Sequence, residues 1–308
     1  MWLLNSSHLL RLGQDVGGRA DTVRVAVIGM FGSGGVKEQH PMKNTDYLTT
    51  NVSQLQPTYF ELQAYWGATK HMGGVKTTRD LIELCRIDTN SYVLDVGCGV
   101  DATPSYLARQ VGCKVVGIDI SDAMLARAQE KIERDGVTDH VELRLSDVQH
   151  LPFDDGTFDA AIVESVLTFV ADKQKAISEC ARVIKLGGYV GINEETWLKP
   201  PTPKLVEYAA RTWDIPAEIL MTAGWVELLT RAGLRDIIAR PYAFNASLGE
   251  YLSEIRRYSF REYFAMFSRA LGLYFKNAGF RKYMKGRFSS VPKEFFQYLG
   301  YGIFAGKR

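Results

Sequence analysis

Three aspartates, each at or near the end of a predicted strand, have the type and spacing to bind a nucleoside. The chain holds Asp95 before a Gly-Cys-Gly turn, Asp119 twenty residues after the turn's last glycine, and Asp147 after the third predicted strand. Glycines let a backbone turn approach a ligand closely, and a helix that starts there offers free N–H groups. At these places Asp119 can accept both ribose hydroxyls and Asp147 an adenine amino group. Each aspartate alone is equally well a helix cap or turn residue, but the three in this order indicate a nucleoside site.

The surrounding sequence alternates short apolar runs with helical patterns. Runs such as Ala160–Val163 are typical of strands buried on both faces, and strands alternating with helices predict parallel βαβ units. We therefore expect an α/β fold with a doubly wound, mostly parallel sheet whose carboxyl edge gathers the three aspartates. The expected strands cover residues 92–96, 114–119, 141–145, 159–163, 189–193, 235–240 and 298–305. The expected helices cover residues 58–70, 76–86, 104–111, 122–135, 173–184, 204–212, 216–232 and roughly 248–285.

Two other nucleotide motifs fit the sequence poorly. The dinucleotide fingerprint needs a third glycine in the first helical turn after Gly99, and its absence disfavours a dehydrogenase. Residues 31–35 form a glycine-rich turn, but Pro41 and polar residues follow where a phosphate loop needs a helix. The Gly-Lys-Ser/Thr ending of such a loop is also missing.

From about Tyr65 to Asn193 the chain resembles the class I S-adenosylmethionine-dependent methyltransferases. The resemblance is closest to the branch that contains ubiquinone and menaquinone methyltransferases and many small-molecule enzymes. It is strong over nearly half of the chain and covers the last hundred residues only in outline. Leu186 departs from the proline that is usual before the fifth strand. The segments that carry the resemblance are Val93–Gly99, Val116–Ser121, Asp147 with Leu151–Asp154 and Phe158–Asp159, Val183–Gly188 and Gly300–Ala305.

This resemblance implies a Rossmann-like methyltransferase fold with seven strands, the last of them antiparallel beside the sixth. It implies S-adenosyl-L-methionine as the cofactor and methyl transfer to a small molecule (EC 2.1.1) as the activity. Two of the residues resemble positions that close over the methionine moiety, namely Tyr65 and Gly73. The implied cofactor-binding residues are Tyr65, Gly73, Asp95, Gly97, Cys98, Gly99, Asp119, Ile120, Asp147, Val148 and Glu164.

Asp101 stands where the family usually has a third glycine. About 4 Å from the cofactor's carboxylate, a second carboxylate costs roughly 1 to 4 kcal/mol, and facing the cofactor's ammonium it stabilises by a similar amount. Aspartate also tolerates left-handed backbone, so we expect cofactor binding to persist. A non-catalytic binding protein or partner subunit with a methyltransferase fold is the alternative that Asp101 leaves open.

Methyl transfer from a sulfonium needs alignment, and a base only where the acceptor carries a proton at attack. The candidate catalytic residues are His71, Glu164 at the end of the fourth strand and Glu195 after the fifth. His71 is explained as well by a helix cap, and Glu164 by a cleft wall without chemistry.

The last third of the chain combines aromatic and basic residues. Aromatic and leucine side chains from Phe260 to Phe275 have the spacing of one helix face, which fits either an ordinary core face or a wall for an apolar or aromatic acceptor. Residues 256–287 hold nine Lys or Arg and one acid, about +8, in a chain of net charge +2. That charge suits an acidic group on the acceptor or peripheral contact with an anionic membrane. It also fits single-stranded nucleic acid, so an RNA-directed methyltransferase is a second alternative, although no dedicated nucleic-acid domain is recognisable.

Length and composition suit one large domain, with 308 residues that are 46% hydrophobic. We expect residues 1–45 to be a poorly ordered extension, and residues 46–308 a methyltransferase domain with a helical lid inserted at about 200–232 and 246–297. Four scattered cysteines form no CxxC pair, so we expect no metal site and reduced thiols. No apolar run reaches the roughly 18 residues of a membrane span. A soluble, cytoplasmic enzyme is expected, and a homodimer stays open.

Overall fold

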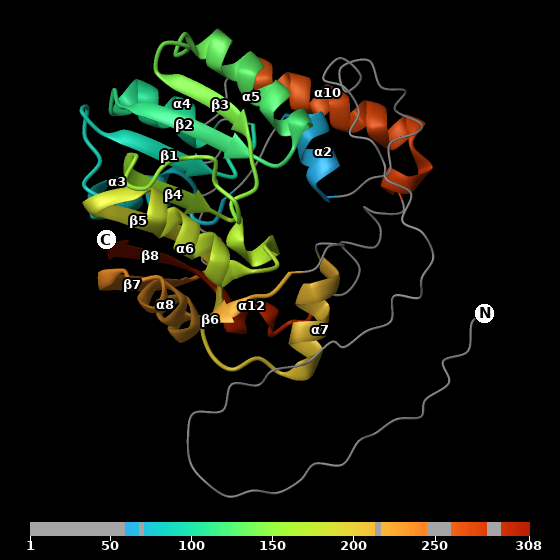
Figure 1. Cartoon of the computed structure of the whole chain (residues 1–308). Coiled ribbons are helices and arrows are strands. Elements are labelled where there is room, and N and C mark those ends of the chain that lie inside the picture. The colour runs from blue at the N-terminus through green and yellow to red at the C-terminus, as the bar shows by residue number, and fades with distance from the viewer. Residues whose placement is uncertain (1–58, 68–70, 101, 213–216, 245–259, 282–290) are drawn as a thin grey trace, which may run out of the picture. The chain divides into compact units, whose positions relative to one another are not determined.

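Seven strands form the main path of one sheet, in the order β3-β2-β1-β4-β5-β8-β7 (Figure 1). β1 to β5 pair in parallel, and β8 lies antiparallel between β5 and β7. The mostly parallel, doubly wound sheet with an antiparallel last strand is therefore confirmed. The strands are β1 (Tyr92–Val96), β2 (Lys114–Asp119), β3 (Val141–Leu145), β4 (Phe158–Glu164), β5 (Ile184–Trp197), β6 (Leu220–Met221, beside β5), β7 (Arg235–Ala243) and β8 (Leu299–Lys307).

The computed structural model describes residues 59–67, 71–100, 102–212, 217–244, 260–281 and 291–308. All of them belong to one unit, residues 41–308. The extension predicted for residues 1–45 and the residue Asp101 lie outside the described residues. The helices are α2 (Tyr59–Trp66), α3 (Gly74–Leu84), α4 (Ala102–Gln110), α5 (Asp122–Asp135), the 3-10 turn η2 (Leu167–Phe169), α6 (Lys173–Val183), α7 (Pro203–Thr212), α8 (Thr222–Arg231), α10 (Phe260–Lys276) and α12 (Phe295–Tyr298).

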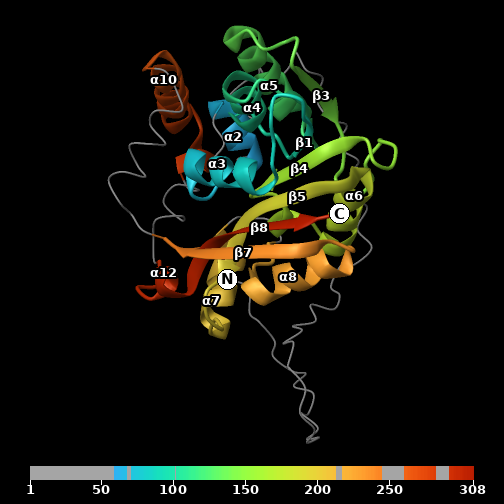
Figure 2. The ribbon, with the colours of Figure 1, turned by 90° about the vertical axis from the view of Figure 1, so that its left-hand side faces the viewer.

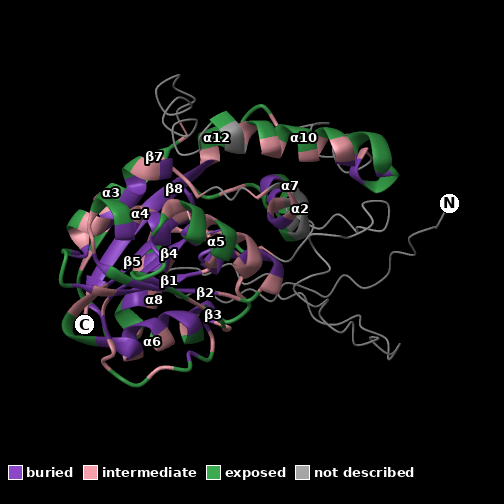
Figure 3. Cartoon of the chain, turned by 90° about the horizontal axis from the view of Figure 1, so that it is seen from above, coloured by how far each residue is buried: buried purple, intermediate pink, exposed green. Residues whose placement is uncertain are grey.

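Helices cover both faces of the sheet (Figure 3). On one face Val93 belongs to a buried cluster with Leu81 of α3 and Leu107 of α4. On the other face the next residue, Leu94, belongs to a cluster with side chains of α6 and α8. Successive strand side chains point to opposite faces. Both residues are fully buried because helices cover both of these faces. Burying one such side chain stabilises the fold by about 1.5 to 3 kcal/mol, which is why the central strand β1 is mostly apolar.

Local signals set the ends of the helices that carry the site. Ser121 lies at the end of β2, and its hydroxyl accepts the backbone N–H of Met124 to cap α5. Gly136 ends that helix in the left-handed region, with φ of 69°. Asp172 caps α6 by accepting the N–H of Lys175 at 2.9 Å. The residues that follow β2 and β4 are therefore fixed by short-range chemistry.

The expected helix over residues 216–232 is wrong in its first part. Leu220 and Met221 form a strand beside Thr196 and Trp197 of β5, and α8 begins only at Thr222. α8 also packs against α6 and β7 with Trp225 fully buried, so it belongs to the layer that covers the sheet. The lid therefore stays a prediction for α7, α10 and α12.

α10 packs against α2, which in turn packs against α5 (Figure 2). Leu273 of α10 is fully buried, but the face that carries Phe264 and Phe267 is exposed by 66% and 65%. The aromatic stripe is thus neither a core face nor part of the cavity described below. Among the described helices, none is long and apolar enough to cross a membrane.

Candidate active site

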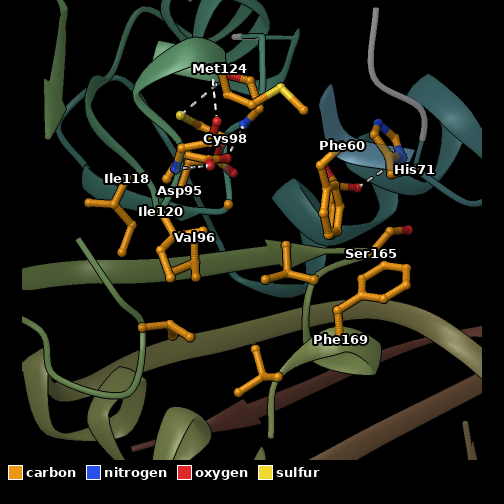
Figure 4. Close-up of a pocket in the computed structure, with 18 of the residues that line it drawn as sticks. Phe60, His71, Asp95, Val96, Cys98, Ile118, Ile120, Met124, Ser165 and Phe169 are labelled. Carbon is orange, nitrogen blue, oxygen red and sulfur yellow. Dashed lines mark hydrogen bonds and ion pairs between the residues drawn. The ribbon is translucent and has the colours of Figure 1, made fainter. Parts of the chain in front are cut away.

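A cavity of about 430 Å³ opens at the carboxyl ends of the parallel strands. This is the edge at which doubly wound sheets bind ligands. Figure 4 shows Asp95, Cys98 and Ile120 on one side of it, and Phe60 and Phe169 on the other. The predicted site residues that line it are His71, Asp95, Gly97, Cys98, Gly99, Asp119, Ile120, Asp147, Val148, Glu164 and Glu195.

The turn between β1 and α4 needs its glycines. Gly97 and Gly99 have φ of 68° and 55°, in the left-handed region that side chains disfavour. A Cβ at position 97 would also lie 2.3 Å from Cγ2 of Val166. The N–H of Cys98 donates to the carbonyl of Ile118 at 2.9 Å, which ties the turn to β2. The glycine backbone of this turn is therefore closely packed against Val166 and tied to β2.

Asp119 connects that turn to the end of β2. Its Oδ2 accepts the N–H of Gly99 at 2.9 Å, and its Oδ1 accepts the N–H of Ser121 at 2.9 Å. Burial raises the pKa of the Asp119 carboxyl, and the backbone donors oppose that shift. A carboxylate oxygen has about two lone pairs, so each oxygen can accept a further hydrogen bond.

The end of β3 contributes Asp147, which already has a partner in the chain. Both of its oxygens accept the side-chain amide of Gln149, at 3.2 and 3.1 Å, and Oδ1 also accepts the Gln149 N–H. Sequence reasoning missed Gln149, which lines the cavity. Ile120 is 75% exposed although it borders the cavity, and it offers an apolar surface.

Glu164, at the end of β4, is the centre of a buried polar cluster. Its Oε2 accepts the Thr103 hydroxyl at 2.8 Å, and both of its oxygens lie 3.2 Å from the Thr78 hydroxyl. Asn193 Nδ2 approaches Oε1 at 3.5 Å, and His71 Nδ1 lies 3.3 Å from the same oxygen. The side chain of Glu164 is only 4% exposed, so four segments of the chain hold it in place.

His71 does not act as the cap of α3. That position belongs to Gly73, with φ of 70° and no side-chain hydrogen bond. His71 instead pairs with Glu164, while its Nε2 lies 3.2 Å from the hydroxyl of Thr78. The threonines were missed from the sequence, because single hydroxyl residues inside helical patterns carry no motif.

Tyr65 and Gly73, the other predicted contacts, do not line the cavity. α2 turns Phe60 and Gln63 toward it, and Tyr65 lies on another side of that helix. Gly73 is close-packed, since a Cβ there would lie 2.8 Å from Cε2 of Tyr301. Its glycine therefore serves packing at the start of α3.

Two consecutive glutamates, Glu194 and Glu195, lie near the carboxyl end of β5. Glu194, missed from the sequence, is fully buried and accepts the N–H groups of Val166, Leu167 and Thr168 at 2.8, 2.7 and 3.2 Å. Burial, and then the neighbouring Glu195, raise the pKa of Glu194 to about 7. Burial also raises the pKa of Glu195, which lines the cavity. Glu194 thus fixes η2, while Glu195 faces the ligand space.

Comparisons with known proteins identify the domain that builds this cavity. A family model described as a methyltransferase domain matches residues 94–192. The chain is 34% identical to the demethylmenaquinone methyltransferase of Lactiplantibacillus plantarum over 135 residues, 43% of this chain and 56% of that protein. It is 34% identical to the methyltransferase GfsG of Streptomyces halstedii over 119 residues, 39% and 43% of the two chains. The chain thus spans about half the length of these relatives.

The fold is shared with solved methyltransferases. Phosphoethanolamine N-methyltransferase 2 of Haemonchus contortus, in complex with phosphomonomethylethanolamine and S-adenosylhomocysteine, superposes with a TM-score of 0.63. It is 18% identical, and the match covers 87% of this chain and 60% of that one. The strand order, the matching domain and the relatives together support a class I S-adenosylmethionine-dependent methyltransferase domain in this chain.

Proposed function

We propose that the protein transfers a methyl group from S-adenosylmethionine to a small, apolar or aromatic acceptor at carbon, oxygen or nitrogen. The observation that carries the proposal is the Asp119 carboxylate. The N–H groups of Gly99 and Ser121 each occupy one lone pair, one on each oxygen. A carboxylate has about four lone-pair sites, so Asp119 can still accept a hydrogen bond from a ribose hydroxyl.

The rest of this wall fits the cofactor. The left-handed turn at Gly97 and Gly99 leaves backbone without side chains for a ligand to approach. Ile120 offers an apolar surface for adenine, and Asp147 and Val148 stand at the next strand end. The cavity volume of about 430 Å³ lies within the roughly 300 to 1,000 Å³ typical of ligand sites. When bound, S-adenosylmethionine supplies an electrophilic methyl group on sulfur.

The chain's own residues orient the acceptor and handle a proton. Phe60 and Phe169 meet edge to face, with ring centroids 5.3 Å apart, and give the cavity an apolar wall opposite Asp95 (Figure 4). His71 and Glu164 form the proton-holding pair of the proposal. A proton leaving the acceptor is taken at one of these two side chains, and the hydroxyls of Thr78 and Thr103 keep Glu164 fixed.

We also propose peripheral contact between α10 and an anionic membrane. Phe260, Phe264, Phe267 and Phe275 are exposed by 87%, 66%, 65% and 71%. Residues 256–287 supply about +8 of charge, from nine basic residues and one acid. The double variant F264S/F267S is expected to lose binding to phosphatidylglycerol-containing vesicles in sedimentation. Leu186→Ser removes an exposed apolar side chain elsewhere and should retain vesicle binding. Equal retention of vesicle binding by both variants would contradict the proposal.

A cytoplasmic location and a homodimer remain proposals. The four cysteines are free and buried, which suits a reducing compartment. Burial raises the pKa of Cys85 and Cys180 to about 12, so these thiols stay protonated and unreactive. Light scattering of the purified protein measures the oligomeric state directly.

Calorimetric titration with S-adenosylmethionine and S-adenosylhomocysteine tests the cofactor assignment. Micromolar binding that Asp119→Ala abolishes is the expected result, followed by tritium transfer from labelled cofactor into an apolar metabolite extract. If the parent protein binds neither compound and Asp101→Gly restores binding, the protein is a non-catalytic member of the family. If neither protein binds, the proposed function is contradicted.

A further inference from the structure

The end of β5 places two buried carboxylates side by side with opposite surroundings. Glu194 and Glu195 are exposed by 0% and 1%. Glu194 accepts three backbone N–H groups and the hydroxyl of Thr168 at 2.9 Å, so its charge is well compensated. Glu195 Oε2 has no hydrogen-bond partner among the residues that the structure describes. Adjacent residues of one strand thus differ in whether their oxygens are satisfied.

Glu195 belongs to the end of the cavity that lies away from Asp119. Apart from Ser165, the residues after β4 that line the cavity with it are apolar, namely Val166, Phe169, Val170 and Ala171. Burial raises the pKa of Glu195, as expected for a carboxyl in such surroundings. An unsatisfied acceptor in a buried, apolar wall is costly, and native proteins rarely keep one without a use.

We propose that Glu195 Oε2 is the recognition point for the methyl acceptor and takes a hydrogen bond from an N–H or O–H group of that molecule. This inference rests on the proposed function and narrows it. The acceptor is then an apolar or aromatic molecule that carries one donor, an amine or a hydroxyl. The apolar residues bind its body, and Glu195 fixes its orientation relative to the reacting atom.

Such a site selects strongly in two directions. A molecule of the same shape without the donor leaves Oε2 unpaired, and sites built to hold a substrate N–H or O–H reject such analogues far better than apolar pockets distinguish methylenes. A molecule with a carboxylate at that end meets a like charge in a buried setting and is excluded. Specificity therefore comes from one atom in an otherwise permissive wall.

Four matched probes test the proposal: benzylamine, benzyl alcohol, toluene and benzoate. Their binding to wild type, Glu195→Gln and Glu195→Leu is measured by ligand-observed NMR, with and without S-adenosylhomocysteine. We expect the amine or the alcohol to bind wild type best, and Glu195→Leu to weaken that probe by roughly tenfold or more while leaving toluene unchanged. Glu195→Gln keeps an oxygen acceptor without the charge, so it should retain the alcohol and lose the amine. This arm separates the two donor classes.

Several outcomes would overturn the inference. One is equal binding of the donor probes to wild type and Glu195→Leu, and another is toluene binding as well as either donor probe. Binding of none of the donor probes also counts against it. A second measurement needs no ligand: at about pH 8, Glu195→Leu should raise the denaturation midpoint, because it removes a buried carboxyl that has one oxygen without a hydrogen-bond partner among the described residues. A lowered midpoint would mean that water or protein already satisfies Oε2.

The inference and the proposed function can fail separately. Glu195 lies away from Gly99 and Asp119, so both Glu195 variants should bind S-adenosylhomocysteine as wild type does. Loss of cofactor binding in wild type contradicts the methyltransferase proposal, whatever the probes do. Normal cofactor binding with probes indifferent to position 195 contradicts only the role of Glu195.

Discussion

Asp119→Asn separates the charge of the carboxylate from its shape. Oδ2 and Oδ1 each accept one backbone N–H at 2.9 Å, from Gly99 and Ser121. In the variant, the amide nitrogen must face one of these N–H groups, so one charge-assisted bond is lost and the other weakens. Losing a hydrogen bond to a charged group costs about 1.5 to 3 kcal/mol. The loss of folding stability is smaller than this cost, because burial raises the Asp119 pKa and thus already disfavours the ionised form in wild type.

The cost to cofactor binding is not offset in this way. One carboxylate oxygen, an acceptor, becomes an amide donor, and a loss of about 1.5 to 3 kcal/mol corresponds to a roughly 10- to 150-fold weaker Kd for S-adenosylhomocysteine. Calorimetry measures this Kd, and urea denaturation measures the free energy of unfolding, which we expect to fall by about 1 to 2 kcal/mol.

Asp122→Asn is the matched control. Asp122 lies in the first turn of the same helix, α5, but does not line the cavity. Its charge interacts only with the helix dipole, so the variant should lose about 0.3 to 1 kcal/mol of stability and no affinity. Affinity within twofold of wild type for Asp119→Asn, or an equal loss for Asp122→Asn, would refute the assignment of Asp119.

Three further predictions follow from the geometry. Gly97→Ala should lower the free energy of unfolding in urea by about 2 to 5 kcal/mol, because φ is left-handed and the new Cβ would lie 2.3 Å from a valine methyl group. Gly136→Ala has a similar φ, 69°, but no atom within 4 Å of the new Cβ, so it should lower that free energy by only about 1 to 2 kcal/mol. Similar costs for both would show that packing at position 97 is unimportant. Because the pKa of Glu194 is raised to about 7, the folded state holds its proton longer than the unfolded chain, and this contribution to stability is lost as pH rises from about 4.5 to 7. The unfolding free energy of Glu194→Gln minus that of wild type should therefore rise by up to about 3 kcal/mol between these pH values. A difference that does not change with pH would mean that the pKa of Glu194 is ordinary. Thr103→Val removes the hydroxyl 2.8 Å from Glu164 and should cost about 1.5 to 3 kcal/mol, with an altered pH profile of methyl transfer; an unchanged profile would leave the hydroxyl a purely structural role.

The sequence predicted what depends on regular periodicity. β1 to β4 and α5 are found within a residue of their expected bounds, because apolar residues recur through each strand and Ser121 and Gly136 mark the ends of α5. The place of Asp119 followed from its distance to Gly99 along the chain. β6 was missed, since Leu220–Met221 is two residues long and carries no periodicity that separates it from the following helix.

Contacts between distant segments could not be predicted in the same way. His71 meets Glu164 only because α3, which His71 precedes, packs beside β5 and β8, and Thr78 and Thr103 reach the same carboxylate from two different helices. No local pattern encodes such a meeting. The aromatic spacing of α10 was clear in the sequence, but whether that face is covered depends on its neighbour, α2.

The position of β8 has a consequence for how the protein is made on the ribosome. β5 and β7 are not neighbours and are joined only through β8, whose residues 299–307 are synthesised after both. Until then each strand presents an unpaired edge, and Ile192 of β5, which is fully buried in the final fold, lacks its β8 neighbour Phe304. Nascent chains that carry β5 and β7 without β8 are therefore the most aggregation-prone species of this protein, and chaperones acting late in translation should matter most for its yield.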